Sequence, residues 1–354
     1  MKKKKQTRNM LIGIAAVFCV AILFALLSSK KVFKADETYL VINDREYTKQ
    51  EFDYFFYGNL NDFYSTYGQI ISYMGLDLSG DLSTQYYSED QTWEDYFYDM
   101  TVEMLKEHHA LNEDAKANGF EFNTDASFAN LKTTMITTAT SYGIDKAEYF
   151  KECYGPYATE VNIEPLAREV LYVTAYKEHL KENQEITDAA IAETYAAAKG
   201  DYDYFDYWTF MLQAKTTDDM TDEQKKAATE KAKEDADEFV KRLGKGEKFN
   251  DLCLEYATEE QKSSLESDGA LSERVNLSGV SNALTEWLMD ESRKVGDTEI
   301  IDNGESGYYS IIMFENRYFD DEARTELRDK LASEVVTQKI TEMANALSIV
   351  HKSR

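Results

Sequence analysis

The chain has 354 residues, with 39 lysines and arginines against 66 aspartates and glutamates, and therefore a formal net charge of −27. This balance argues against a nucleic-acid-binding protein, because phosphate contacts require clustered cations. A hydrophobic content of 43% and an aromatic content of 13% suffice for buried cores and exclude wholesale disorder. At about 150 residues per domain, the length predicts about two domains.

The N-terminal region differs from the rest of the chain in charge and hydropathy. The first 35 residues hold eight cations and no acid, and residues 10–27 (MLIGIAAVFCVAILFALL) carry no charge. A helix over this run is about 27 Å long, close to the roughly 30 Å hydrocarbon core of a bilayer. We therefore expect a single-pass signal anchor in the cell membrane, a cytoplasmic basic tail and an extracytoplasmic body. A cleaved signal peptide is the alternative.

The region after the anchor predicts a short strand followed by helices. Residues 38–48 (TYLVINDREYT) indicate a strand, a turn and a helix start, with Thr48 and Glu51 as a capping box. From there to about Leu180, apolar residues recur at spacings of three and four. Residues 47–98 contain 16 aromatic residues. Helix cores explain most of them, but we expect some tyrosines to be exposed, where they suit contact with unfolded chains or partner surfaces.

A small α+β domain is expected next, because the hydrophobic period changes. Thr221 and Gln224 form a capping box, and Gly244 ends the helix that follows. The expected elements are a strand at 202–212, helices from 221, at 249–256 and at about 281–292, and strands at 299–302 and 308–314.

A long amphipathic helix is predicted over residues 321–350, and its apolar face needs a partner. We expect it to pack on the N-terminal helical region. The expected face comprises Leu327, Leu331, Val335, Ile340, Met343 and Leu347.

Cysteine and histidine spacings indicate no metal site or disulfide framework. Cys153 and Cys253 fall in different predicted domains, as buried free thiols or, alternatively, as an interdomain bridge. Cys253 falls at a predicted core position. His108 and His109 are adjacent on a charged helix and point about 100° apart, which argues against a shared metal ion, so we interpret them as a solvated surface pair.

Several segments occur in the order found in one protein family. They are LVINDREYTKQEFDYFF, TWEDYFYDMTVEMLKEHHALNEDAKANGFEF, GKGEKFNDLCLEYAT, SDGALS and SGYYSIIMFENR. In this order they resemble the SurA and PrsA type of extracytoplasmic foldase. The first two resemble its helical chaperone domain, and residues 202–318 resemble its parvulin domain, a peptidyl-prolyl isomerase.

This resemblance implies an α+β fold in which a parvulin-like domain of antiparallel sheet and helices is inserted into a mainly helical chaperone domain. The implied organisation is a basic tail at 1–9, a transmembrane signal anchor at 10–28, a SurA-N-like chaperone domain at 36–200, a parvulin-like domain at 201–319, and a C-terminal helix at 320–354 that packs on the chaperone domain.

The resemblance also implies an isomerase site, from which this chain departs. The family's first-strand histidine aligns with Phe210, its last-strand histidine with Tyr309 or Ser310, and its cysteine or aspartate near Glu259 or Glu260. None of the four histidines lies between residues 201 and 318. Hydroxyls of Thr209, Tyr309 and Ser310 remain as hydrogen-bond donors. The candidate apolar pocket for a proline-containing substrate comprises Phe210, Met211, Leu284, Trp287 and Ile311.

The function indicated by these features is that of a membrane-anchored chaperone that binds unfolded exported polypeptides. Its parvulin-like domain is expected to be weak or inactive as an isomerase. The alternatives are an active prolyl isomerase and a non-catalytic scaffold for one envelope partner. No cofactor, metal or nucleic acid is expected, and the oligomeric state stays open.

Overall fold

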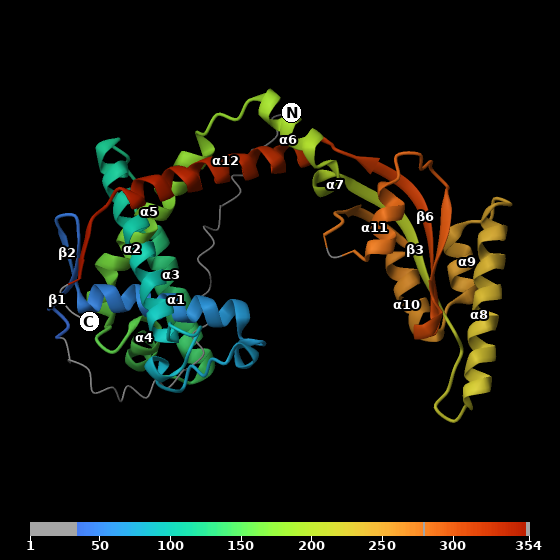
Figure 1. The fold of residues 1–354 in the computed structure, drawn as a ribbon, viewed down its shortest axis with the longest axis horizontal. Helices are drawn as coiled ribbons and strands as arrows, with labels where there is room; N and C mark the ends of the chain where they lie inside the picture. Colours follow the sequence, from blue (N-terminus) through green and yellow to red (C-terminus); the bar gives the residue numbers. More distant parts are fainter. Residues whose placement is uncertain (1–33, 279, 352–354) are drawn as a thin grey trace. The chain divides into compact units, whose positions relative to one another are not determined.

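The computed structural model describes residues 34–278 and 280–351, which form two compact units (Figure 1). Unit 1 contains the described residues up to Glu185 and from Ala332 onward, and unit 2 is Ile186–Leu331. Within the described ranges, none of the helices combines the length and the apolar character that crossing a membrane requires. The predicted anchor at residues 10–28 lies outside these ranges.

Unit 1 begins with a hairpin that the last strand of the chain extends. The antiparallel sheet has the order β2-β1-β7, formed by β1 (Thr38–Ile42), β2 (Arg45–Thr48) and β7 (Ile349–His351). Asn43 adopts a left-handed conformation (φ 52°) in the turn, and its side-chain oxygen accepts a hydrogen bond from the Ser348 backbone. The prediction missed β2, and it wrongly continued the last helix into β7. The pairing of β7 with β1 depends on tertiary contacts that local periodicity does not reveal.

Five helices form the body of unit 1, and several start at the polar caps that the sequence indicates. The predicted Thr48–Glu51 capping box is present, and Gly119 (φ 66°) follows the end of the second helix. The helices are α1 (Lys49–Tyr67), α2 (Trp93–Ala117), α3 (Asp125–Tyr142), α4 (Lys146–Tyr154) and α5 (Glu160–Glu182), with short 3-10 turns η1 (Ile71–Met74) and η2 (Leu82–Thr84) between α1 and α2.

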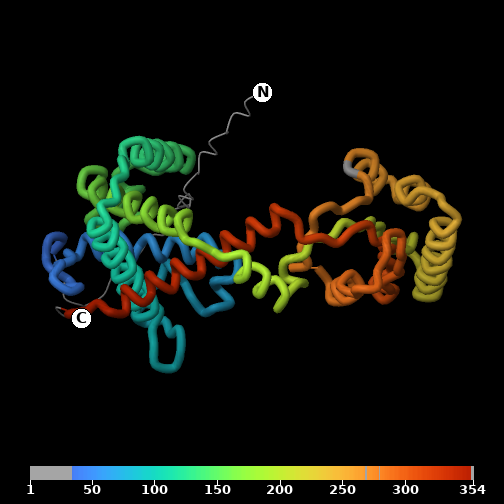
Figure 2. The backbone as a smooth tube through the Cα atoms, turned by 90° about the horizontal axis from the view of Figure 1, so that it is seen from above, coloured from blue at the N-terminus to red at the C-terminus, as the bar shows by residue number. Residues whose placement is uncertain are grey.

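The last helix, α12 (Asp321–Asn345), begins in unit 2 and ends in unit 1. In unit 1 its end lies along α2 and α5 (Figure 2), where Val336 and Ile340 pack in one cluster with Leu111 and Tyr176. The expected apolar face was wrong at Val335, which is 43% exposed. The neighbouring Val336 is buried instead, because the true stripe continues at spacings of four to Ile340.

Unit 2 is built around a four-stranded antiparallel sheet with the order β4-β3-β6-β5. The expectation of an α+β fold is therefore confirmed. The elements are α6 (Asp188–Ala197), α7 (Lys199–Tyr202), β3 (Tyr204–Gln213), α8 (Asp222–Leu243), α9 (Phe249–Tyr256), α10 (Glu259–Asp268), β4 (Leu271–Val275), α11 (Asn282–Met289), β5 (Thr298–Asn303), the 3-10 turn η3 (Gly304–Ser306) and β6 (Tyr308–Tyr318).

Different helices cover the two faces of this sheet, with α11 on one side and α8 and α9 on the other (Figure 1). Successive side chains of a strand point to opposite faces, so Phe210 and Leu212 meet α8 and α9, whereas Tyr207 meets α11. Cys253 of α9 is a buried free thiol in the first of these cores. This excludes a Cys153–Cys253 bridge.

Candidate functional site

Unit 1 exposes a group of large apolar side chains on the segment between α1 and α2. Tyr73 is 89% exposed and Tyr86 is 68% exposed. We call this group the tyrosine surface; it comprises Tyr67, Ile70, Tyr73, Met74, Tyr86 and Tyr87. Single exposed apolar residues are ordinary on protein surfaces, but a concentration in one short segment is typical of an interaction site.

The segment that carries the tyrosine surface is anchored by side chains that are buried against α1 and α2. Leu76, Leu78 and Leu82 are buried in a cluster with the aromatic rings of Phe63, Trp93 and Phe97 on α1 and α2. The Gln85 side chain closes the segment, because its amide nitrogen donates to the Asp77 carbonyl (2.8 Å) and its oxygen accepts from the Asp77 backbone N–H (2.7 Å). The exposed rings therefore project from a fixed base.

Such a surface suits weak and sequence-tolerant contacts. Tyrosine offers a large apolar ring with a polar tip, and it loses little conformational entropy on binding. Exposed carboxylates of Asp77, Glu89 and Asp90 lie on the same segment, which gives it a negative charge. The surface can therefore hold apolar stretches of an unfolded chain and attract cationic ones.

The structure does not bring the predicted proline pocket together. Phe210 and Ile311 are buried against α8 and α9, whereas Leu284 and Trp287 belong to α11, in the core on the opposite face of the sheet. The alternation of strand side chains is the physical reason. Phe210 and Met211 are adjacent in β3 and cannot share one face.

The remaining predicted site residues are scattered in the same way. Tyr309 is buried on the α8 side, whereas Ser310, paired with Met211, faces the α11 side together with Thr209. Met211 is 40% exposed, and its carbonyl accepts a hydrogen bond from Gln261 of α10 (2.8 Å).

The acidic candidates near the start of α10 lie on the surface. Glu259 and Glu260 are both exposed, and Glu259 is paired with Lys262. The next residue of the helix, Gln261, contacts β3 through the Met211 carbonyl. The side chains on the α11 side of the sheet include the hydroxyl groups of Thr209 and Ser310. They include no imidazole, because all four histidines of the chain lie in unit 1.

His108 and His109 are buried, so the interpretation as a solvated surface pair was wrong. α2 is a central helix that contacts α1 on one side and α5 on another, so adjacent positions can both be covered. His109 forms a hydrogen bond with the Tyr47 hydroxyl (3.2 Å). Within residues 34–278 and 280–351, neither ring nitrogen of His108 has a hydrogen-bond partner, although Nδ1 lies 3.5 Å from the Glu169 carboxylate. Burial lowers the pKa of His108 to about 4, which the nearby Glu169 carboxylate only partly offsets.

Glu169 is held by a partly buried polar network beside these histidines. Arg45 donates two hydrogen bonds to its carboxylate and Asn112 donates a third. Burial acts to raise the pKa of Glu169, but the bond from Arg45 and the charges of His108 and Arg45 bring it below its usual range. Among the described residues, no group of three His, Cys, Asp or Glu could hold a metal ion. This network therefore ties β2, α2 and α5 together.

Sequence reasoning anticipated exposed tyrosines but did not locate them. The available signal was the stretch from Gly68 to Gln91, in which aromatic residues continue while the helical spacing stops and glycine, serine and aspartate become frequent. Aromatic residues that follow neither a helical nor a strand period do not line up on one side of an element, so they are not all expected to pack into a core.

The chain matches no protein-family model and no curated protein. Among solved structures it is similar to PrsA from Bacillus subtilis, at 19% identity over 74% of this chain and 93% of that chain, with a TM-score of 0.25. It is also similar to the foldase protein PrsA from Streptococcus pneumoniae, at 12% identity over 75% of this chain and 94% of that one, with a TM-score of 0.31.

A third similar structure comes from a report on two SurA-like chaperones of Campylobacter jejuni, at 17% identity over 68% of this chain and 94% of that chain, with a TM-score of 0.25.

Proposed function

We propose that this protein is a chaperone that holds newly exported, unfolded polypeptides through the tyrosine surface of unit 1. The N-terminal apolar run anchors it in the cell membrane, with both units on the extracytoplasmic side. The observation that carries the proposal is the exposure of Tyr73 and Tyr86 on a segment fixed by buried leucines.

Unit 2 acts in this proposal as a weak or inactive parvulin-like module. Rotation about an X-Pro bond faces a barrier of roughly 20 kcal/mol, which an enzyme lowers with groups that favour the twisted amide. Support for weak activity comes from the separation of Phe210 and Ile311 from Leu284 and Trp287, which lie on opposite faces of the sheet.

An aggregation assay tests the holding activity. The chain from residue 36 onward, at several-fold molar excess, is expected to delay the aggregation of a chemically unfolded client protein. Tyr73→Ser with Tyr86→Ser is expected to raise the concentration needed for half protection about five- to thirtyfold, since each aromatic contact is worth about 0.5–1 kcal/mol.

The matched control replaces exposed apolar side chains elsewhere in unit 1. Tyr142 is 54% exposed and Val161 is 82% exposed, and both lie outside the tyrosine surface. Tyr142→Ser with Val161→Ser should leave protection unchanged. An equal loss of protection in the two double variants would show that any exposed apolar area delays aggregation, and it would contradict the proposal.

The isomerase alternative has its own measurement. The rate of cis–trans isomerisation of an X-Pro peptide is followed with and without the exported chain at micromolar concentration. We expect no acceleration, or only a weak one. Acceleration comparable to that of an efficient isomerase would refute the assignment of unit 2 as a weak or inactive module.

A further inference from the structure

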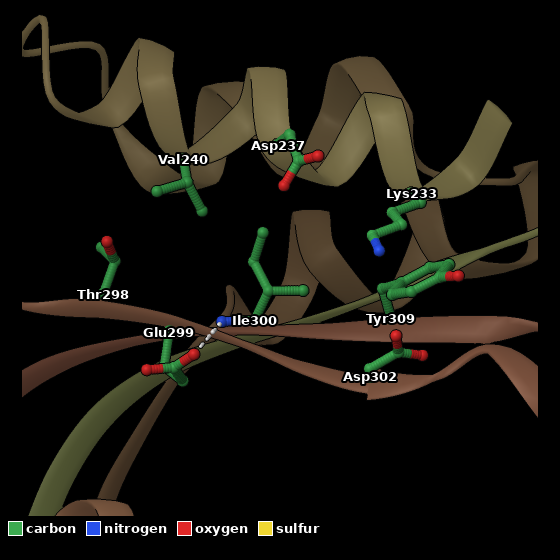
Figure 3. A pocket seen from close by; sticks show the side chains of 8 residues that line it. All are labelled: Lys233, Asp237, Val240, Thr298, Glu299, Ile300, Asp302 and Tyr309. Atoms are coloured by element: carbon green, nitrogen blue, oxygen red, sulfur yellow. Dashed lines mark hydrogen bonds between the residues drawn. The ribbon is translucent and has the colours of Figure 1, made fainter. Parts of the chain in front are cut away.

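Strand β5 forms one border of the unit 2 sheet, and its outer edge pairs with no other strand in the part of the chain that the structure describes. Its inner edge pairs with β6, and the Asp297 carbonyl accepts a hydrogen bond from the Phe314 N–H (2.8 Å). Inward and outward groups alternate along an antiparallel strand, so Thr298, Ile300 and Asp302 direct their N–H and C=O groups to the free edge. The Ile300 N–H accordingly donates to the carboxylate of its neighbour Glu299 (3.3 Å; Figure 3).

A groove of about 390 Å³ lies beside this edge, between β5 and α8. Figure 3 shows Lys233, Asp237 and Val240 extending from α8 toward the sheet, with Ile300 and Tyr309 rising from the strands. A further strand placed alongside β5 would direct every second side chain into this groove.

The groove has a negative charge. Its lining includes the carboxylates of Asp237, Glu299 and Asp302 and a single cation, Lys233. The same field reaches Tyr309, whose pKa is raised first by burial and then by Asp302, Asp237 and Glu230. A cationic side chain that enters the groove would therefore be stabilised.

We propose that the free edge of β5 binds an extended basic peptide segment by strand addition, with alternate lysine or arginine side chains directed at Asp237 and Asp302. The backbone of the segment pairs with Thr298, Ile300 and Asp302. This site is separate from the tyrosine surface and belongs to the other unit.

The negative charge of the groove favours a basic peptide segment over the other possible partners of the β5 edge. A second copy of the chain that paired β5 against β5 would bring Glu299 and Asp302 of both copies close together, and like charges across a strand pair are destabilising. An acidic segment is disfavoured for the same reason. A basic extended segment satisfies both the unpaired backbone groups and the carboxylates.

The probe is a fluorescein-labelled ten-residue peptide of alternating lysine and threonine, and the comparison peptide alternates glutamate and threonine. Binding to the full chain in detergent is measured by fluorescence anisotropy at low salt. We expect the lysine peptide to bind at least about tenfold more tightly than the glutamate peptide. Hydrogen exchange of the complex should show slower exchange at the Ile300 amide.

Two variants separate backbone pairing from charge. Ile300→Pro removes an outward donor without breaking a β5–β6 bond, and proline is tolerated on edge strands, so the lysine peptide should bind at least about tenfold more weakly. Asp237→Asn with Asp302→Asn should weaken binding about fivefold. The amide that replaces the Asp302 carboxylate retains an oxygen that can accept from the Gly304 N–H, so the turn is preserved.

Two controls complete the design. Glu286→Gln removes an exposed carboxylate on α11 and should leave the dissociation constant within about twofold. Tyr73→Ser with Tyr86→Ser should bind the lysine peptide as the wild type does, so that failure of this inference is distinguishable from failure of the proposed function.

Three results would overturn the inference. One is equal binding of the two peptides. Another is a pair of findings: the folded Ile300→Pro variant binds the lysine peptide with wild-type affinity, and the peptide does not slow hydrogen exchange at Ile300 in the wild-type protein. Together they would show that the peptide is attracted by surface charge and does not pair with the strand. The third is protection of Ile300 by dimerisation without peptide.

Discussion

The two units distribute their aromatic residues in opposite ways. In the described part of the chain, the strongly exposed tyrosines, Tyr73 and Tyr86 among them, all lie in unit 1. Unit 2 instead buries its rings against the sheet, as at Phe205 and Phe239, which are both 0% exposed. Unit 1 thus offers apolar contact to a partner, whereas unit 2 offers a backbone edge and negative charge.

The same contrast holds for titratable groups. Unit 1 contains every histidine of the chain, and two of them are buried in its core. Unit 2 has none. The two units therefore differ in the titratable groups that their cores can hold.

The largest expected effect is a loss of stability that is confined to unit 2. Phe239 is fully buried; its ring stacks on Phe210, meets Phe249 edge to face and lies tilted against Tyr256. Phe239→Ala should destabilise unit 2 by about 3–5 kcal/mol, through lost burial and the cavity left behind. Urea unfolding followed by hydrogen exchange should show this loss in unit 2 amides only. An equal loss in unit 1 would show that the units unfold as one.

Acid should weaken unit 1 through His108. Its pKa is about 4 in the folded chain against about 6.5 unfolded, so the unfolded state binds more protons between these values. The stabilisation is complete above about pH 6.5 and is lost as the pH falls toward 4. At pH 4.5 the loss relative to pH 7 should be about 2.5 kcal/mol.

His108→Leu removes this part of the pH dependence, and urea unfolding of unit 1 at pH 7 and pH 4.5 measures it. Glu169, Arg45 and His109, the charged and titratable groups around His108, remain in the variant. His179→Gln, at an exposed imidazole, is the matched control. Identical pH dependence in His108→Leu and the wild type would contradict the assignment.

A smaller effect is expected at the helix caps. Thr221 caps α8 in unit 2 and Thr48 caps α1 in unit 1, each accepting a hydrogen bond from the third residue of its helix. Thr221→Ala and Thr48→Ala should each cost about 1 kcal/mol. Hydrogen exchange should place each loss in its own unit, and a loss that appeared in the other unit would break the comparison.

The smallest expected effect is that of salt on client holding. From residue 36 on, 31 cations oppose 66 acids, a net charge of −35. Raising salt from 50 to 300 mM should weaken the binding of a basic unfolded client about two- to threefold through screening. If salt has no effect, the charge serves solubility alone.

Local features were predictable from the sequence because their causes are local. The capping boxes at Thr48 and Thr221 depend on two residues three positions apart, and the helix Phe249–Tyr256 has the predicted bounds. The elements that were missed lack such signals. Leu271–Val275 becomes a strand by pairing with β3, and α10 (Glu259–Asp268) is almost wholly polar.

The candidate site was less predictable because it depends on which faces meet. The alternation of Phe210 and Met211 already indicated that these two residues could not line one pocket. The burial of His108 between α1 and α5 depends on helix packing, which the sequence of α2 does not reveal.

Site-specific photo-crosslinking tests the central claim most directly. A photoreactive amino acid is placed at position 73, on the tyrosine surface, or at position 142, which is exposed on α3. Each protein is mixed with a reduced, alkylated client that cannot fold, or with the same client in its native state. Strong crosslinking at position 73 to the unfolded client alone, with little at position 142, is the predicted result. Equal crosslinking at both positions, or crosslinking of the native client at position 73, would contradict the claim.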